Sequence, residues 1–518
     1  MNRSAALAGL REDRPLDILV VGGGATGVGV AVDAATRGYR VGLLEQEDFG
    51  KGTSSRSTKL VHGGVRYLQQ GNVSLVMEAL RERGRLRHNA PHLVHDLSFV
   101  VPNYAWWEGP FYGIGLRVYD LLAGRHGFGP SRHLSRDEVL AAIPTLETEG
   151  LRGGVLYHDG QFDDARLLIA LARTAEQHGA MLVNHCAVTR LLHDAHGIVT
   201  GVVAVDRERG DEFELRAGCV VNATGAFADG LRRLDDPAVE PLIAPSQGIH
   251  LVLDRAFLAG DTAIMVPRTS DGRVLFAIPW HGRTLIGTTD TRIDAPLLEP
   301  RAQEREIDFV LSTAARYLTR DPTRADVLSV FAGVRPLVAH GDGTRTASLS
   351  RDHSIHVSRS GLLTIAGGKW TTYRQMAQDV VEQAALLAHL EERPCVTRDL
   401  HLHGWHEDPK RLGELGDWGS DADAIEALAR DVPALAERLH PRLPYRMAQV
   451  VFGARHEMAC RLEDVLARRT RALLLDTRAA AECAPRVAAV LAAELGRDSR
   501  WAEEQTVVFR ELCAGYLP

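Results

Sequence analysis

The chain has 518 residues, of which 45% are hydrophobic, and its formal net charge is -7. This length exceeds what one hydrophobic core usually holds, so we expect two or three domains. Lys and Arg are dispersed among the acidic residues, which argues against nucleic acid as a partner because a phosphate backbone requires a clustered basic surface.

Cysteine spacing and the length of apolar runs indicate the cellular compartment of the protein. The six cysteines lie far apart with no C-x-x-C pair, so we expect free thiols in a reducing cytoplasm and no metal site. The first 15 residues lack the apolar core of a signal peptide, and no apolar run approaches the ~18 residues of a membrane helix. We therefore expect a cytoplasmic protein that does not span a membrane, while a peripheral position on the cytoplasmic membrane stays open.

The first 45 residues follow the pattern of a βαβ unit. An apolar run over 16–21 predicts a strand, the small residues of 25–37 predict a helix, and 39–44 predict a second strand. The turn after the first strand, 22–27, fits G-x-G-x-x-G, and Glu45 follows the second strand. This combination predicts a dinucleotide site in which helix-start amides face the pyrophosphate and Glu45 accepts hydrogen bonds from the ribose.

The later elements alternate between strands and helices and then become helical. Helices are predicted over 166–178 and from Thr371, and strands over 180–188, 198–206, 212–221, 250–253, 274–287 and 362–366. Residues 395–518 are rich in Ala, Leu, Arg and Glu, which indicates a helical domain. Two more glycine-bearing segments, 222–225 and 367–369, follow strands. A cofactor lined by several segments favours FAD over NAD, whose sites usually draw on one compact unit.

A loop rich in hydroxyl groups and cations, residues 53–68, reads Thr-Ser-Ser-Arg-Ser-Thr-Lys-Leu-Val-His-Gly-Gly-Val-Arg-Tyr-Leu. This loop and the N-terminal fingerprint resemble the FAD-dependent, quinone-linked glycerol-3-phosphate dehydrogenases of the aerobic bacterial type. The likeness continues at 163–167, 222–225, 286–290, 333–337, 367–374 and 462–470. It therefore covers nearly all of the chain.

The resemblance implies an α/β fold with a Rossmann-like FAD-binding domain of the D-amino-acid-oxidase/glutathione-reductase type, an interleaved substrate domain with an antiparallel sheet, and an all-helical C-terminal domain. The FAD-binding domain is expected at 15–80, 151–245 and 331–390, the substrate domain at 81–150 and 246–330, and the helical domain at 395–518. Cofactor contacts are expected at Gly22, Gly24, Ala25, Thr26, Gly27, Glu45, Thr53, Ser54, Ser55, Ser57, Lys59, Leu60, His62, Gly63, Gly64, Val188, Ala223, Thr224, Gly225, Gly368, Lys369, Thr371 and Thr372.

The substrate implied by the resemblance is sn-glycerol 3-phosphate, which would be oxidised to dihydroxyacetone phosphate. A phosphate favours arginine, which stays charged and binds two oxygens at once. Either His62 or His250 suits a general base near neutrality, and Lys369 is expected to stabilise negative charge on the reduced flavin. Substrate contacts are expected at Arg66, Tyr67, His250, Arg335, Arg351 and Lys369, and catalytic residues among His62, His250, Arg335 and Lys369.

The electron acceptor implied by the resemblance is a membrane quinone. An aromatic cluster beside Arg117 is typical of an interfacial membrane anchor, and equally of a substrate-domain core or a homodimer contact. Its members are Trp106, Trp107, Phe111 and Tyr112. A basic group near the C-terminus, Arg468, Arg469 and Arg471, is expected on a solvated helix face.

Three other functions compete with this interpretation. An oxidase would share the motifs and pass the electrons to dioxygen. An amine or amino-acid oxidase could use the same fold, because fold alone does not determine function. From another class, an FAD-binding scaffold or RNA-modifying protein would oxidise no alcohol, although the acidic charge argues against RNA binding.

Overall fold

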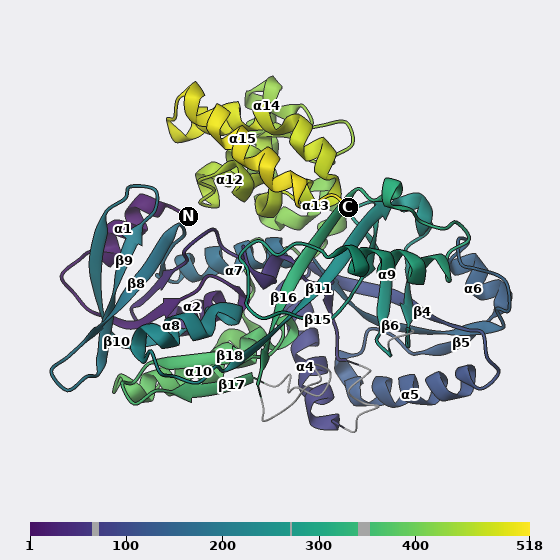
Figure 1. The fold of residues 1–518 in the computed structure, drawn as a ribbon, viewed down its shortest axis with the longest axis horizontal. Coiled ribbons are helices and arrows are strands. Elements are labelled where there is room, and N and C mark those ends of the chain that lie inside the picture. Colours follow the sequence, from purple (N-terminus) through teal and green to yellow (C-terminus); the bar gives the residue numbers. More distant parts are fainter. Residues whose placement is uncertain (65–71, 270–271, 340–352) are drawn as a thin grey trace.

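The structure, a computed structural model, describes residues 1–64, 72–269, 272–339 and 353–518. Three predicted substrate residues, Arg66, Tyr67 and Arg351, lie outside the described residues. Figure 1 shows a first sheet with its helices on the left, a second sheet on the right, and the C-terminal helices above both.

The first sheet is built around β1, which pairs in parallel with β2 on one side and β10 on the other. Nearly all of β1 is buried, and a strand covered on both faces requires the continuous apolar run that predicted it. The sheet order is β17-β18-β10-β1-β2-β7. Its strands are β1 (Leu16–Val21), β2 (Val41–Leu44), β7 (Met181–Val183), β10 (Glu212–Asn222), β17 (His353–Val357) and β18 (Leu363–Gly367).

Helices cover this sheet and confirm the βαβ prediction. α2 (Ala25–Thr36) packs between α7 (Asp164–Gln177) and α10 (Tyr373–Leu387) in one apolar core. α8 (Ala228–Asp235) contacts β8 and β18. α1 (Arg3–Leu10), which the sequence pattern did not predict, packs against β7 and buries two leucines.

The strand predicted over 180–188 is two strands. His185 adopts a left-handed backbone with φ of +51°, so the chain turns there. β7 therefore stays in the parallel sheet, while β8 (Cys186–His193) pairs with β9 (Val199–Asp206), which pairs in turn with β10.

The second sheet is mainly antiparallel, with the order β15-β11-β14-β13-β12-β4-β6-β3, and β5 and β16 pair with β6 and β11. α4 (Val73–Asn89), α5 (Glu108–Ala123), α6 (Arg136–Ala142) and α9 (Glu304–Ala315) pack around it. Its strands are β3 (Leu60–Val61), β4 (Val94–Asn103), β5 (Arg132–Ser135), β6 (Gly153–Phe162), β11 (Ile243–Asp254), β12 (Thr262–Val266), β13 (Leu275–Trp280), β14 (Arg283–Gly287), β15 (Thr291–Arg292) and β16 (Ser329–Val338).

Three strands of this sheet lie in ranges assigned above to the FAD-binding domain. β3 falls in the range 15–80, β6 in 151–245 and most of β16 in 331–390. In the structure β6 pairs with β4 along its whole length, and β16 pairs with β11. These pairings join residues far apart in sequence, so local periodicity could not reveal them.

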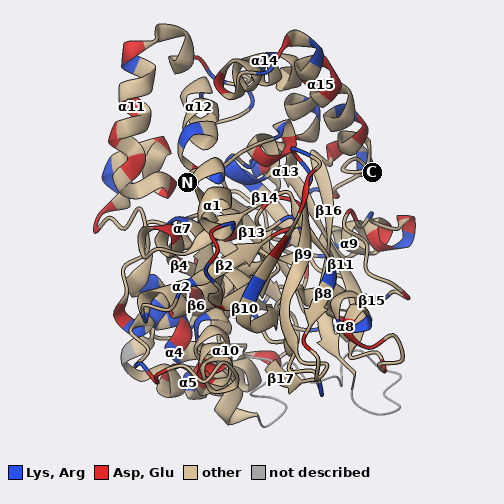
Figure 2. Ribbon diagram, turned by 90° about the vertical axis from the view of Figure 1, so that its left-hand side faces the viewer, with Lys and Arg blue, Asp and Glu red and all other residues tan. Residues whose placement is uncertain are grey.

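Residues 395–518, all of them described, confirm the helical prediction. The main elements are η9 (Pro409–Asp421), α11 (Ala422–Asp431), α12 (Met447–His456), η11 (Asp464–Arg469), α13 (Ala472–Leu475), α14 (Thr477–Leu495) and α15 (Ser499–Ala514). Figure 2 shows charged residues of both signs where these helices meet the two sheets.

Candidate active site

A cavity of about 590 Å³ lies between the two sheets. It begins at the glycine turn after β1, passes the segment that follows β2, and ends against β11 and β16. Most of the predicted cofactor residues line it, and so do all the predicted catalytic residues. These lining residues are Gly22, Gly24, Ala25, Thr26, Glu45, Thr53, Ser54, Ser57, Leu60, His62, Val188, Ala223, Thr224, Gly225, His250, Arg335, Gly368, Lys369 and Thr371.

The glycine turn leaves no room for side chains. Gly22 has φ of +112°, and a Cβ there would lie 2.6 Å from the carbonyl oxygen of Ala223. At Gly27 a Cβ would lie 1.9 Å from the carbonyl oxygen of Gly22, so this residue supports close packing of helix and strand and does not itself line the cavity. The start of α2 therefore presents bare amides to the cavity, as a dinucleotide pyrophosphate requires.

Side chains from two other segments complete this end of the cavity. The Glu45 carboxylate accepts hydrogen bonds from the amides of Gly23 at 2.6 Å and Glu47 at 2.9 Å. Burial raises the pKa of Glu45. The Ser54 hydroxyl accepts a hydrogen bond from the amide of Ala25 at 2.9 Å.

Several other predicted cofactor residues do not line the larger cavity. Ser55, Gly63 and Thr372 lie behind its wall, and Gly64 lines a second, smaller cavity. The Lys59 ammonium turns away from the cavity and donates to Asp164 at 2.7 Å and to the carbonyl of Ser55 at 2.8 Å. Lys59 is fully buried, and burial lowers its pKa to about 8.

The second cavity, of about 220 Å³, joins the first at Thr58, Leu60, His62 and Arg335. One side of it is apolar and aromatic. The other residues that line it include Gly64, Phe99, Tyr157, Asp159, Met265, Arg273, Phe276, Thr288, Thr289 and Asp290. The arginine at 273 was not predicted as a site residue, since nothing in its neighbourhood in sequence distinguishes it from a surface cation.

His250 lies on β11 at the boundary of the larger cavity and is 3% exposed. Its Nε2 is 2.9 Å from the Thr58 hydroxyl, and its ring stacks on Phe331 with the centroids 5.0 Å apart. Burial, followed by the charges of Lys59 and Arg335, lowers the pKa of His250 well below 6.5. The ring is therefore neutral at physiological pH.

Arg335 lies on β16, opposite Ser246 of β11, and lines both cavities. Its Nη2 donates to the Thr288 hydroxyl at 3.1 Å and to the carbonyl of Thr289 at 3.0 Å, and its Nη1 lies 3.4 Å from Asp290. These contacts hold the guanidinium in one orientation. The predicted motifs 286–290 and 333–337 thus meet in space at this arginine.

Comparison with family descriptions gives two matches. Residues 17–374 match "FAD dependent oxidoreductase", and residues 359–505 match "C-terminal domain of alpha-glycerophosphate oxidase". The boundary between the two falls within the segment that carries Lys369.

Known proteins of similar sequence are named for one activity. Glycerol-3-phosphate dehydrogenase, mitochondrial, from Homo sapiens is 39% identical over 98% of this chain and 75% of its own length. The mitochondrial glycerol-3-phosphate dehydrogenase of Arabidopsis thaliana is 42% identical over 95% of this chain and 84% of its own length.

Two solved structures show how far the likeness extends in space. The glycerol-3-phosphate dehydrogenase of Bacillus halodurans, complexed with FAD, superposes with a TM-score of 0.80 at 31% identity, covering 100% of this chain and 98% of that one. The L-alpha-glycerophosphate oxidase of Mycoplasma pneumoniae, with FAD bound, gives a TM-score of 0.56 at 16% identity over 75% of this chain and 98% of its own. The second likeness concerns the fold alone.

The glycine turn generates a test of cofactor binding. A side chain at Gly24 would enter the cavity, and its Cβ would lie 3.2 Å from the Ser54 hydroxyl. Gly24→Val should displace that hydroxyl from the Ala25 amide and weaken FAD binding by about tenfold or more, since an unpaired buried amide costs 1–3 kcal/mol. The measurement is the FAD dissociation constant of the reconstituted protein. Gly115→Ala, on α5 with open space around its Cβ, is the control, and equal affinities in both variants would contradict the assignment.

Proposed function

The chain belongs to the FAD-dependent oxidoreductases and, within them, to the glycerol-3-phosphate dehydrogenases, and on this premise we propose that it oxidises sn-glycerol 3-phosphate to dihydroxyacetone phosphate with a membrane quinone as the electron acceptor. The observation that carries the proposal is the meeting of the two cavities at Arg335 and His62. A small anion held at this junction lies beside the part of the larger cavity that β11 and β16 close.

FAD fits the larger cavity, because the bare amides of α2, Glu45 and the segment 53–58 form a continuous lining for a long cofactor. Bound FAD would supply the acceptor for the hydride that leaves carbon-2 of the substrate. Arg335 supplies a fixed charge that can hold two phosphoryl oxygens. Arg273 adds a second cation from the far side of the smaller cavity.

The proton of the substrate hydroxyl needs a base, and the two candidate histidines differ in burial. A general base works best when its pKa lies near the operating pH. The pKa of His250 is far below that value, so His250 is a weak base and serves to hydrogen-bond the hydroxyl. His62 lines both cavities and is less deeply buried. We therefore assign the base to His62.

This assignment predicts different kinetics for two variants. His62→Gln should slow flavin reduction at saturating substrate by about a hundredfold or more. His250→Gln should mainly raise KM and should leave the fall in rate at low pH where it is, because the pKa of His250 already lies well below 6.5. Anaerobic stopped-flow across pH 5 to 8 measures both. A shifted acid limb in His250→Gln, with little loss in His62→Gln, would reverse the two roles.

The acceptor separates the proposal from its nearest rival, an oxidase that uses dioxygen. The similar sequences named above are dehydrogenases, which supports the quinone, although residues 359–505 match a domain described from an oxidase and the solved oxidase structure shares the fold at 16% identity. After anaerobic reduction by glycerol 3-phosphate, a soluble quinone should reoxidise the flavin at least about tenfold faster than air-saturated buffer, a difference of 1.4 kcal/mol in barrier. Faster reoxidation by oxygen, with stoichiometric hydrogen peroxide, would favour the oxidase. A flavin that glycerol 3-phosphate never reduces would reject both.

A quinone acceptor requires contact with a membrane, and we assign this contact to α5. Within the described residues no helix is long and apolar enough to cross a bilayer. α5 instead exposes an apolar stripe at helical spacing, made of Phe111, Ile114, Val118 and Leu121, with Trp106 and Trp107 just before the helix. Tyr112, predicted in the same anchor, is half-buried and packs on the core. The protein would then lie on the cytoplasmic face of the membrane, bound by this stripe.

The stripe can be tested without any turnover. Phe111→Ser combined with Leu121→Ser removes two of its most exposed side chains and should reduce binding to liposomes by about tenfold or more, since each buried large side chain contributes 1.5–3 kcal/mol. Val507→Ser with Val508→Ser, on α15 and also exposed, is the matched control. Co-flotation with vesicles of bacterial lipid measures binding. Equal flotation of both double variants would show that the stripe does not hold the membrane.

A further inference from the structure

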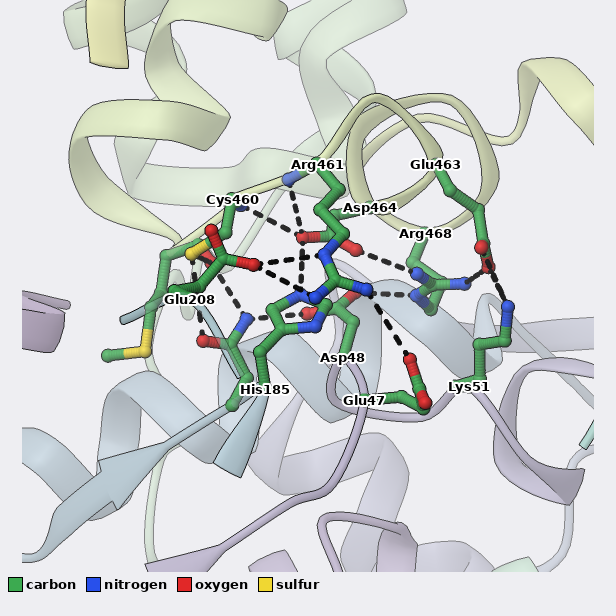
Figure 3. A network of polar contacts seen from close by, with 12 residues as sticks. Glu47, Asp48, Lys51, His185, Glu208, Cys460, Arg461, Glu463, Asp464 and Arg468 are labelled. Carbon is green, nitrogen blue, oxygen red and sulfur yellow. Dashed lines mark hydrogen bonds and ion pairs between the residues drawn. The ribbon is translucent and has the colours of Figure 1, made fainter. Parts of the chain in front are cut away.

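The segment between β2 and β3, residues 46–59, forms one wall of the larger cavity, and we call it loop 46–59. Its inner side includes Thr53, Ser54 and Ser57. Its outer side faces the C-terminal domain, as Figure 3 shows for Glu47, Asp48 and Lys51 beneath the helical turn that carries Arg468, and Lys51 also lines the cavity. The same short segment therefore lines the cofactor cavity and contacts another domain.

Asp48 makes the most deeply buried of these contacts. It accepts hydrogen bonds from Arg468 Nε at 2.5 Å and from Arg469 Nη1 and Nη2 at 2.6 Å and 2.8 Å. Although burial alone would raise it, these two arginines hold the pKa of Asp48 well below its ordinary value. The arginines are 3% and 0% exposed, so the expectation of a solvated basic face is wrong.

Two more contacts bind loop 46–59 to the C-terminal domain. Lys51 Nζ lies 2.6 Å from the carboxylate of Glu463. Arg56 Nη2 donates to the hydroxyl of Tyr516 at 3.0 Å, next to the C-terminus. The loop is thus held along its length.

Arg471 extends this connection to the end of the loop. It is 1% exposed, and its Nη2 donates to Asp164 Oδ1 at 2.7 Å and to the carbonyl of Ser55 at 3.3 Å. The other oxygen of Asp164 accepts from the amide and hydroxyl of Ser57 at 3.1 Å and 2.7 Å and from Lys59 at 2.7 Å. One carboxylate therefore joins the arginine of the C-terminal domain to the residues of the cavity wall.

Buried ion pairs add little net stability compared with apolar side chains of similar size, because each charge loses its hydration. Ion pairs do fix how the two parts are oriented relative to each other, since each charged group must meet its partner at hydrogen-bond distance. Adhesion between the C-terminal domain and the second sheet is already apolar, because buried side chains of both form one continuous core. The charges here lie where loop 46–59 meets the domain.

We propose that the C-terminal domain acts as an outer clamp that sets the position of loop 46–59, and that Arg471 is its principal positioning residue. Arg471 orients Ser57 through Asp164 and Ser55 by its own hydrogen bond, and thereby positions the cavity wall against the flavin. The clamp acts on the site of bound FAD and involves neither glycerol 3-phosphate nor a quinone. The C-terminal domain would thus contribute to cofactor binding, although none of the described residues of either cavity belongs to it.

The test compares Arg471→Met and Arg471→Lys with Arg486→Met in the full-length holoenzyme. Arg486 pairs with Glu437 on the surface of the same domain. We expect Arg471→Met to raise the FAD dissociation constant about tenfold or more and to make the flavin midpoint potential more negative, because a positive charge near the cofactor is lost. Arg471→Lys should restore the potential, since it keeps the charge. Arg486→Met should match the wild type in both measurements.

The result that overturns the proposal is a folded Arg471→Met variant whose FAD affinity and flavin potential equal those of the wild type, even if its melting temperature falls. If Arg471→Met does not fold, Glu463→Gln tests the same contact by a smaller change, because it removes one carboxylate charge, which Lys51 and Arg468 meet. An FAD dissociation constant raised about threefold or more supports the clamp, and a smaller change rejects it. Neither measurement uses substrate, so failure of the proposed activity leaves the outcome readable.

Discussion

The carboxylate of Asp164 is the interaction on which the site most depends. It lies at the start of α7 and accepts hydrogen bonds from Ser57, Lys59 and Arg471. These partners belong to the cavity wall, to the residue just before β3 of the second sheet, and to the C-terminal domain. A carboxylate has about four acceptor positions, so it can serve all of them at once, which a neutral side chain could not. One buried anion thus joins the three parts of the molecule at the edge of the cofactor cavity.

The parts of the fold that the sequence predicted are those whose cause is local. A strand buried on both faces must be apolar throughout, and a turn that approaches a pyrophosphate must be glycine-rich, so 16–27 could be interpreted without knowledge of any other segment. The hydroxyl-rich loop 53–58 and the motifs at 222–225 and 367–369 were also recognisable in isolation. The structure brings all of them to one cavity.

The features that the sequence did not predict depend on distant partners. Whether Arg468, Arg469 and Arg471 lie in water or in the interior is decided by Asp48 and Asp164, which are hundreds of residues away. A basic run has the same composition in either case. The role of Arg273 and the pairings of β6 and β16 were hidden for the same reason. The motif at 163–167 was recognised by resemblance, but its physical task, to meet the C-terminal domain, becomes visible only in the fold.

The wall of the site is contacted from two ends of the molecule. The C-terminal domain lies at one end and α5 at the other (Figure 1), so a membrane bound at α5 would leave the clamp in water. On its inner face α5 carries Tyr119, whose hydroxyl accepts from the amide of Gly63 at 2.8 Å and donates to Asp159 at 2.8 Å. The residue after His62 is therefore held by the helix that we propose contacts the membrane.

Arginines of the C-terminal domain thus hold loop 46–59 from one end of the molecule, and a tyrosine of α5 holds the segment after the loop from the other end. In the first constraint the Asp48 carboxylate has a lowered pKa, because Arg469 and Arg468 face it. Its contribution to stability is complete above the ordinary carboxyl pKa of 3.8 and is lost as the pH falls below that value. At neutral pH this contact is fully ionised. A cavity wall fixed in this way needs no rearrangement to receive a flavin, and the binding energy of the cofactor is not spent on ordering the loop.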